Sequence, residues 1–410
     1  MKTQAIALFA GLGLAGTSAQ AADLIAPPIT DPVDYVRVCD AFGVGFFYIP
    51  GTETCLRIAG RVRADYNVFI DFEDNGFEVL DTFGFDDRGD DAYRFRARSY
   101  LYMDSRTATE FGLLRTFSEV QFTQDTNAPI DTTLNRAFIQ FGGLTFGRTQ
   151  SFYDFLDATF GTAQLLNANY SDTTTNVLAY TAAFGNGFSA SLSIEDSSER
   201  SVAIADPADF IPAATFAATN DGYGGTRFPD VVGNIRVDQG WGSAQLMGAG
   251  HYVHPGAVNT GSDYGFAVGG GVTVNVPFGE STQIGIQGAY TVGALSYVAE
   301  TPIGPGVADA VYTSATTMSL VNAFSVSGGA SFAFTPTISV GLQGGYLNVD
   351  HADVAGVSYD FVNWDAEAFI GYAPVPGFTL GVGAQFKYVD TDDFSDGAAL
   401  STFFRAQRTF

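Results

Sequence analysis

The fold is decided by residues 56–72, Leu-Arg-Ile-Ala-Gly-Arg-Val-Arg-Ala-Asp-Tyr-Asn-Val-Phe-Ile-Asp-Phe. Apolar side chains occupy most even positions, and charged or polar side chains occupy most odd positions. Residues 93–104, Tyr-Arg-Phe-Arg-Ala-Arg-Ser-Tyr-Leu-Tyr-Met-Asp, alternate in the same way, with the apolar set at odd positions. Because successive side chains of a strand point to opposite faces, the alternation predicts strands with one apolar and one charged face.

Two kinds of architecture accommodate such strands. In a soluble β-sandwich the apolar face packs on a second sheet, whereas in a transmembrane barrel it meets lipid and the polar face lines a lumen. The connections favour the barrel over a sandwich or a Gly-rich solenoid, because seven short turns alternate with eight longer polar segments. We therefore predict an all-β fold, a sixteen-stranded antiparallel transmembrane β-barrel over residues 55–410, with short periplasmic turns and longer outer loops. The predicted strands are 55–72, 91–104, 109–124, 133–141, 144–150, 176–184, 188–196, 228–238, 243–254, 263–276, 282–298, 314–334, 338–350, 356–373, 378–390 and 398–410.

The N-terminus predicts export. Lys2 is followed by an uncharged apolar run from Ala5 to Gly16 and by small residues at Ala19 and Ala21. This is the pattern of a secretory signal peptide, which we place at residues 1–21, with a buried N-terminal helix as the alternative. The run is shorter than the ~20 residues that a membrane-spanning helix needs. Residues 22–54 would form an N-terminal segment on the periplasmic side.

Charge and cysteine content narrow the function. The 410 residues carry 44 acidic and 19 basic side chains, a net charge of −25, which argues against nucleic-acid binding because phosphate backbones are held by Lys and Arg. Cys39 and Cys55 are the only cysteines, and in an oxidising compartment we expect them to form a disulfide. Metal binding is the weaker interpretation, since the three histidines lie far away in sequence.

Arginines are concentrated on the predicted lumen face. Only Lys2 and Lys387 are lysines, and twelve of the 17 arginines precede residue 150. Guanidinium groups stay protonated and suit a fixed charge in a pore. The alternative, which we consider equally weighty, is a stabilising salt-bridge lattice with Asp65, Asp71, Asp104 and Glu119. The candidate pore-wall residues are Arg57, Arg61, Arg63, Arg94, Arg96, Arg98, Arg115 and Arg136.

The segment 151–175 differs from the other long connections, because it is rich in aromatic and apolar residues and carries no basic side chain. Such a loop is poorly suited to standing free in water, so we predict that it folds into the lumen as a constriction loop. There it would set Asp154, Asp157 and Asp172 opposite the arginines, and rings of fixed charge tune selectivity in pores. The alternative is a lid or partner-contact loop at the surface.

Several stretches resemble alphaproteobacterial general porins. They are residues 35–43, the Cys-bounded block 47–57, residues 111–117, residues 137–144 and the terminal Phe-Arg-Ala-Gln-Arg-Thr-Phe of 404–410. Arg408 departs from the family pattern, because it occupies one of the alternate positions of the final strand that are usually apolar and face outward. The resemblance covers the first third and both ends of the chain. Over residues 197–400 it is limited to the succession of strands and turns. It implies a homotrimer of sixteen-stranded barrels in the outer membrane, each with its third loop folded inward to form the constriction.

These observations predict passive diffusion of small hydrophilic solutes and ions across a Gram-negative outer membrane, with outer-membrane lipid and lipopolysaccharide as surroundings. A solute-specific channel is the alternative within transport, and a barrel enzyme or an adhesin is a less favoured one. No GxSxG, HExxH or CxxC pattern is present, so we predict no catalytic residue, metal or cofactor. The acidic excess weakly favours cations over anions.

Overall fold

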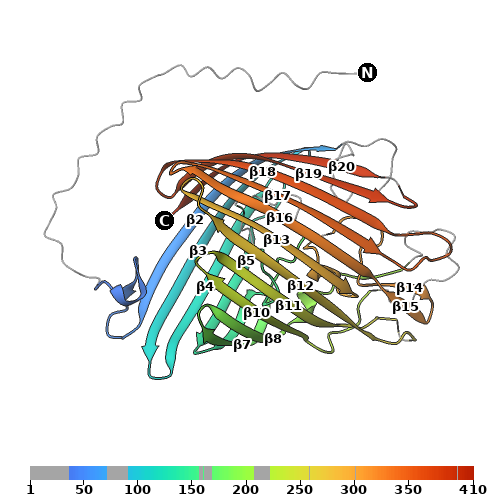
Figure 1. Cartoon of the computed structure of the whole chain (residues 1–410), viewed down its shortest axis with the longest axis horizontal. Helices are drawn as coiled ribbons and strands as arrows, with labels where there is room; N and C mark the ends of the chain where they lie inside the picture. The colour runs from blue at the N-terminus through green and yellow to red at the C-terminus, as the bar shows by residue number, and fades with distance from the viewer. Residues whose placement is uncertain are drawn as a thin grey trace, which may run out of the picture. The chain divides into compact units, whose positions relative to one another are not determined.

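Sixteen long strands form one closed antiparallel sheet in the part of the chain that the computed structural model describes, which is residues 37–71, 91–156, 160, 169–206, 222–257, 259–300, 302–394 and 396–410 (Figure 1). The predicted signal peptide and residues 22–36 lie outside these ranges. The barrel strands are β2 (Cys55–Asp71), β3 (Tyr93–Thr109), β4 (Gly112–Asp125), β5 (Asp131–Phe141), β6 (Leu144–Gln150), β7 (Thr174–Gly185), β8 (Phe188–Glu195), β10 (Asp230–Gln239), β11 (Gly242–Val253), β12 (Asp263–Val276), β13 (Ser281–Val292), β16 (Asn322–Thr335), β17 (Ile338–Asp350), β18 (Phe361–Val375), β19 (Phe378–Thr391) and β20 (Gly397–Thr409).

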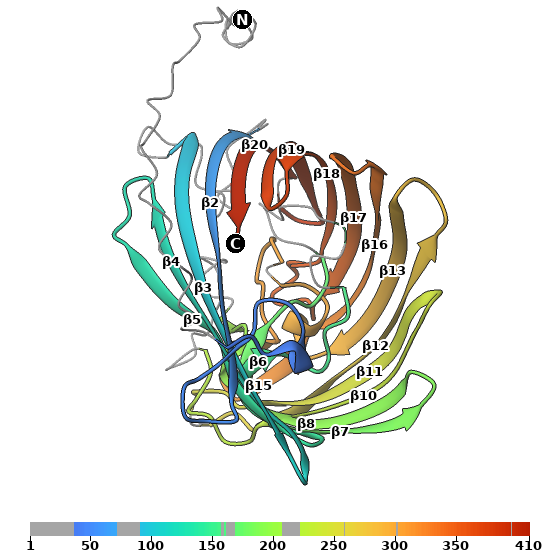
Figure 2. The same ribbon diagram turned by 90° about the vertical axis from the view of Figure 1, so that its left-hand side faces the viewer.

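The first and last barrel strands close the ring. Tyr66 of β2 pairs with Phe95 of β3 on one side and with Phe404 of β20 on the other, and both pairings are antiparallel (Figure 2). An even number of strands allows this closure in an all-antiparallel sheet. The closed ring leaves no unpaired edge, so the backbone donors and acceptors of the strands are satisfied without water, as a lipid environment requires.

Exposure decides between the two predicted architectures. The apolar even-numbered residues of β2 lie on the outer surface, with Ile58 55% exposed and Val62 50% exposed, whereas Asp65 and Asn67 face inward and are buried. A sandwich would bury the aliphatic set against a second sheet. The apolar face of this sheet covers the outside instead, and the barrel prediction is confirmed.

Two bands of outward-facing aromatic residues encircle part of the barrel. We name its ends by their connections: the turn end carries short turns such as 142–143 and 240–241, and the loop end carries the longer connections. The bands mark the two levels where membrane meets water. The loop-end girdle contains Tyr252, Tyr264, Tyr290 and Trp364, and the turn-end girdle contains Phe188, Trp241, Phe278 and Phe334.

The number of barrel strands is as predicted, but four segments differ from prediction. The predicted strand 91–104 extends to Thr109, because β3 and β4 pair up to Thr109 and Gly112, and the turn between them lies at residues 110–111. The predicted strands 282–298 and 356–373 are shorter, since β13 ends at Val292 and β18 begins at Phe361. The predicted strand 314–334 is split: β14 (Ala310–Ser314) and β15 (Thr317–Leu320) form a hairpin that joins β9 (Ile204–Ala205) in a separate three-stranded sheet at the loop end.

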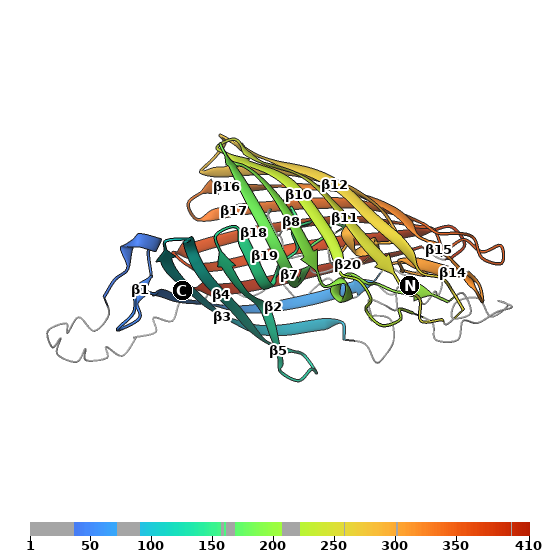
Figure 3. The same ribbon diagram turned by 90° about the horizontal axis from the view of Figure 1, so that it is seen from below.

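A small disulfide block extends from the turn end, at the opposite end of the barrel from β14 and β15 (Figure 3). It contains the 3-10 helix η1 (Asp40–Phe42) and the short strand β1 (Phe47–Tyr48), which pairs with the start of β2. Cys39 and Cys55 form a disulfide, as predicted, and both pack around the buried ring of Phe46. The disulfide therefore ties this block directly to the first barrel strand.

Candidate pore constriction

Loop L3, which we define as residues 151–173 between β6 and β7, turns into the barrel. Its backbone is held by amide and hydroxyl side chains on the inner face of strands across the ring. Asn234 of β10 donates to the carbonyl of Phe152 at 2.6 Å, and Ser327 of β16 donates to the carbonyl of Asn169 at 2.6 Å. Contacts at both ends of L3 thus confirm the predicted inward fold for its described residues, 151–156, 160 and 169–173.

Four glycines lie on the inner wall beneath L3. We call Gly269, Gly271, Gly285 and Gly329 the glycine track; they lie on the inner face of β12, β13 and β16, against the aromatic rings of L3. A Cβ atom on Gly329 would lie 2.6 Å from the Phe160 ring, and a Cβ atom on Gly271 would overlap the ring of Phe155. Because a Cβ atom would take the space that these rings fill, the track lets L3 lie flat on the wall.

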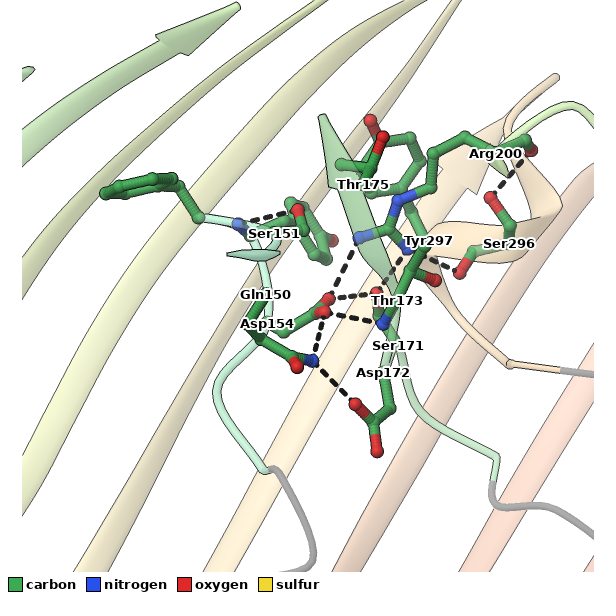
Figure 4. Close-up of polar contacts among 12 residues, drawn as sticks. Gln150, Ser151, Asp154, Ser171, Asp172, Thr173, Thr175, Arg200, Ser296 and Tyr297 are labelled. Carbon is green, nitrogen blue, oxygen red and sulfur yellow. Dashed lines mark hydrogen bonds and ion pairs between the residues drawn. The ribbon is translucent and has the colours of Figure 1, made fainter. Parts of the chain in front are cut away.

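The base of L3 is fastened by a buried ion pair between Asp154 and Arg200, which lies beyond β8 in loop L4, residues 196–229. The two side chains are 0% exposed, and Arg200 Nη2 lies 3.0 Å from Asp154 Oδ1 (Figure 4). Asp154 also accepts from the Thr173 amide at 2.7 Å and from the hydroxyl of Ser171, so one carboxylate holds both ends of the loop. Arg200 further donates to the carbonyl of Ser296 at 3.1 Å.

Burial alone would lower the pKa of Arg200, but the Asp154 carboxylate, helped by Tyr297 and Glu195, raises that pKa above its ordinary value. The guanidinium group is therefore charged at every working pH. Its carbon lies 4.3 Å from the centre of the Tyr297 ring, which adds a cation–π contact. Asp154 and Arg200 together form a charged pair buried between L3 and L4.

The three candidate aspartates have three different placements. The Asp154 side chain is buried beneath the lumen surface, which corrects the expectation that it faces the arginines across the lumen, because Arg200 of another loop neutralises it in place. Asp157 lies outside the described residues. Asp172 lines the lumen and accepts a hydrogen bond from Gln150 at 2.5 Å.

A polar cavity of about 570 Å³ lies where L3 leaves the wall. Basic side chains enter it from β2, β3, β5 and β6, and acidic side chains enter it from L3 and from two loop-end connections. Its charged lining residues are Arg61, Arg98, Arg136, Arg148, Asp172, Glu199 and Glu300. Opposed fixed charges across a water-filled space produce a transverse field, which favours polar and charged solutes over apolar ones.

Arg61 and Arg98 line this cavity and contact neutral side chains there. The guanidinium carbon of Arg61 lies 3.8 Å from the centre of the Tyr100 ring, and Arg98 donates to the Tyr100 hydroxyl at 3.3 Å and to the Thr123 hydroxyl at 2.9 Å. Within the described ranges neither arginine forms an ion pair. Their partners orient the guanidinium groups without neutralising them.

Other wall arginines are paired, as the salt-bridge alternative predicted. Asp104 lies 2.8 Å from Arg106, 3.0 Å from Arg115 and 3.8 Å from Arg57. The other groups are Asp65 with Arg63 and Arg405, Asp125 with Nε and Nη2 of Arg96, and Glu119 with Arg136. Arg94 lies over the ring of Phe69. The side chain of Asp71 is not among those described. The arginine wall is therefore a lattice with a few unneutralised members.

Loop L6, residues 293–321, fills the opposite side of the barrel interior. Leu295, Val298 and Ile303 of L6 pack against inward-facing apolar residues of β17, β18 and β19, among them Leu347 and Phe361. Asn363 of β18 donates to the carbonyl of Ile303 at 2.6 Å. The expectation of a polar outer loop at 299–313 is wrong for this part, because its apolar residues find an apolar patch on the inner wall.

Three residues of the polar cavity were missed by the sequence interpretation: Arg148, Glu199 and Glu300. Arg148 and Glu199 form an ion pair of 2.8 Å that spans 51 positions of sequence. Both glutamates lie in loops, where side chains do not alternate between two faces, so the sequence pattern could not show where they point. Only Arg148 could have been suggested by the sequence, because it directly precedes the inward-turning loop.

The chain matches the family model described as "Porin subfamily" over residues 23–408. It belongs to this porin family. Porin Omp2b of Brucella neotomae is 30% identical over 422 residues, covering 97% of this chain and 96% of the relative. Porin Omp2b of Brucella suis biovar 1 (strain 1330) is 33% identical over 296 residues, covering 68% of this chain and 71% of the relative.

Solved structures show the same fold. The outer membrane channel DcaP of Acinetobacter baumannii superposes with a TM-score of 0.67 at 18% identity, covering 88% of this porin and 99% of that chain. The anion-selective porin from Comamonas acidovorans superposes with a TM-score of 0.52 at 13% identity, covering 87% and 100%. This porin is thus an outer-membrane β-barrel that acts as a passive diffusion channel. Its turn end is the periplasmic end, and its loop end faces outside. Among the described residues, no helix is long and apolar enough to cross a membrane.

Proposed function

We propose that small hydrophilic solutes and ions pass through the polar cavity between the β2–β6 wall and L3, and that this cavity is the constriction. The observation that supports the proposal most strongly is the opposition of Arg61, Arg98 and Arg136 to Asp172 and Glu300 around one open, polar space. L6 occupies the other side of the interior, which directs the water-filled path toward the arginine wall. A barrel enzyme or an adhesin would not require opposed charges across such a space.

We further propose that the protein works as a homotrimer, as the sequence resemblance implies. A trimer form has been described for OmpT of Vibrio cholerae, whose barrel is similar in fold. Slow migration on unboiled gels that changes to monomer migration on heating would support the trimer.

Purified protein in a planar bilayer is expected to give stepwise conductance that rises almost in proportion to salt concentration. An open, water-filled cavity without a high-affinity site passes ions in proportion to their supply. Saturation of the conductance by one sugar or one anion would favour the solute-specific alternative. Absence of steps from folded, heat-modifiable protein would contradict the channel itself.

Opposite charge changes in the cavity are expected to shift ion selectivity in opposite directions. At ~7 Å in water, an elementary charge changes the local energy of an ion by about 0.6 kcal/mol, or about threefold in local concentration, before salt screening. Asp172→Asn should therefore raise the anion-to-cation permeability ratio, and Arg98→Gln should lower it. The measurement is the reversal potential in a KCl gradient.

Arg408→Gln provides the matched control for these two variants. Arg408 lies on the outward parity of β20 near the periplasmic end and hydrogen-bonds the carbonyl of Pro376, so its loss removes a charge outside the lumen. Its reversal potential should equal that of the unmodified protein. If all three variants kept the same reversal potential, Asp172 and Arg98 would not belong to the constriction.

A further inference from the structure

Four aromatic side chains form a continuous strip on the lumen wall, from the polar cavity toward the periplasmic end. They are Tyr100 and Tyr102 of β3, Phe117 of β4 and Phe138 of β5, and we call them the aromatic strip. In this order their ring centres are 6.1, 6.4 and 5.4 Å apart, and the planes of successive rings are inclined by 15°, 24° and 29°. Tyr100 lines the polar cavity, so a solute that leaves the cavity toward the periplasm meets the other three rings next.

The strip faces the water of the lumen. Leu101 and Met103 are 39% and 38% exposed on the outer surface, so Tyr102 between them points inward. The rings of Phe117 and Phe138 follow Tyr102 on the same face. All three rings are only half-buried, which leaves part of their apolar area accessible to a solute in the lumen.

Three arginines beside the strip share one carboxylate. Asp104 forms ion pairs with Arg57, Arg106 and Arg115, and no other carboxylate among the described residues pairs with any of the three. The Asp104 side chain is 1% exposed, whereas those of Arg57 and Arg115 are 42% and 25% exposed. Three positive charges stand against one negative charge, so this part of the lumen wall keeps a positive excess that faces water.

Arg115 joins the ring surface to the positive charge. Its guanidinium carbon lies 5.3 Å from the centre of the Phe117 ring and 5.4 Å from that of Phe138. An arginine has five N–H groups, and three of those on Arg115 donate to Asp104 and to Gln140. The remaining N–H groups are left for an acceptor on a solute that lies against the rings.

Hydrogen-bonding capacity decides which solute fits. Guanidinium groups only donate, both oxygens of Asp104 already accept from arginines, and the Gln140 oxygen accepts from Arg115 at 3.3 Å. A neutral sugar is poorly matched, because its hydroxyls need acceptors as well as donors. A carboxylate only accepts, and it also complements the positive excess.

We propose that the aromatic strip and Arg115 form a weak binding site for carboxylates that carry a planar ring. The ring of the solute would stack on Phe117 and Phe138, and its carboxylate would accept charge-assisted hydrogen bonds from Arg115. This inference rests on the proposed passage of solutes through the polar cavity, which delivers them to the strip. The site accepts a class of solutes and not one compound, so the channel stays general while ring-bearing anions are held longer than others.

The test compares three matched probes by the concentration at which each reduces the KCl current of the protein in a planar bilayer. The probes are naphthoate, its fully hydrogenated analogue and the neutral amide of naphthoate. We expect naphthoate to bind about fivefold more tightly than the hydrogenated analogue, which keeps the charge without a flat aromatic face. It should bind about tenfold more tightly than the amide, which keeps the rings without the charge.

Two variants separate the contribution of the ring from that of the charge. Phe117→Leu should lose most of the preference for naphthoate over the hydrogenated analogue, and Arg115→Gln should lose most of the preference over the amide. Arg115→Gln leaves Asp104 paired with Arg57 and Arg106, so it creates no unpaired carboxylate and the barrel should fold. Heat-modifiable migration of each variant checks that it does.

Matched controls carry the same substitutions outside the lumen. Phe122→Leu changes a phenylalanine of the same strand that is 44% exposed on the outer surface, and Arg408→Gln removes an outward arginine. Both should keep both preferences of the unmodified protein. Equal binding of naphthoate and its hydrogenated analogue, or unchanged preferences in Phe117→Leu and Arg115→Gln, would overturn the proposal.

Tighter binding of a neutral disaccharide than of naphthoate would overturn it as well. The reversal potentials of Asp172→Asn and Arg98→Gln test the constriction by a separate measurement. Loss of the ring preference while those shifts are present would therefore be a failure of the aromatic strip alone.

Discussion

The Arg200→Met variant is expected to lose the fixed position of L3. Removing the guanidinium leaves the Asp154 carboxylate buried without its partner, and breaking one side of a buried pair costs about 3–5 kcal/mol. The Asp154 carboxylate would then move toward water and draw residues 171–173 with it, because it also binds Ser171 and Thr173. We expect noisier single-channel currents, a changed mean conductance and a lower midpoint in denaturant unfolding.

A double variant separates the ion pair from a general packing effect. In Asp154→Asn/Arg200→Met no charge stays buried, and the amide oxygen at position 154 can still accept from Ser171 and Thr173, so the double replacement should cost far less than Arg200→Met alone. The double variant should recover most of the unfolding midpoint and of the current stability lost in Arg200→Met. Currents and midpoint of Arg200→Met equal to those of the unmodified protein would contradict a fastening role for this pair.

The Gly271→Leu variant is expected to lower conductance by pushing L3 away from the wall. A side chain at this position would occupy the space of the Phe155 ring, and overpacking a filled site typically costs about 1–3 kcal/mol. The loop can relieve the overlap only by moving toward the lumen, which narrows the water-filled path. The measurement is the single-channel conductance at fixed salt.

Two further variants test the cause of that loss. Gly288→Leu places the same side chain on the outward face of β13, where a Cβ atom meets only ordinary contacts at 3.7 Å and beyond, so its conductance should not change. Adding Phe155→Ala to Gly271→Leu removes the ring that blocks the new side chain and should restore conductance. If Gly271→Leu conducted like Gly288→Leu, the glycine track would not determine the position of L3.

The barrel could be predicted from sequence because its strands have one face toward lipid and one toward the lumen. Side chains along such a strand alternate between apolar and polar with a period of two residues. The alternation of 56–72 correctly assigned Ile58 and Val62 to the outer surface and Asp65 to the interior. The count of alternating short and long connections gave the correct number of strands. Residues 314–320 were misassigned to the barrel wall, since β15 has a strand composition but pairs with β14, which in turn pairs with β9.

The candidate site was only partly predictable. The alternation of positions along the strands placed Arg61, Arg98 and Arg136 on the lumen face. It does not show which acidic side chain neutralises which arginine. Asp154 was assigned to the lumen because its partner, Arg200, lies 46 positions away in a loop without periodicity. In the same way, Asp65 binds Arg405 across a separation of 340 residues, which only the closure of the ring brings together.

The packing of L6 against the inner wall has a consequence for permeability. Sixteen strands set the circumference of the cylinder, but the largest molecule that can cross is determined by the segments seated within it. Two members of this family with identical strand number and tilt can therefore differ widely in molecular cut-off. Shortening the 293–321 connection would raise the size limit for solutes. The backbone pairing between the barrel strands, which holds the barrel in the bilayer, would stay unchanged.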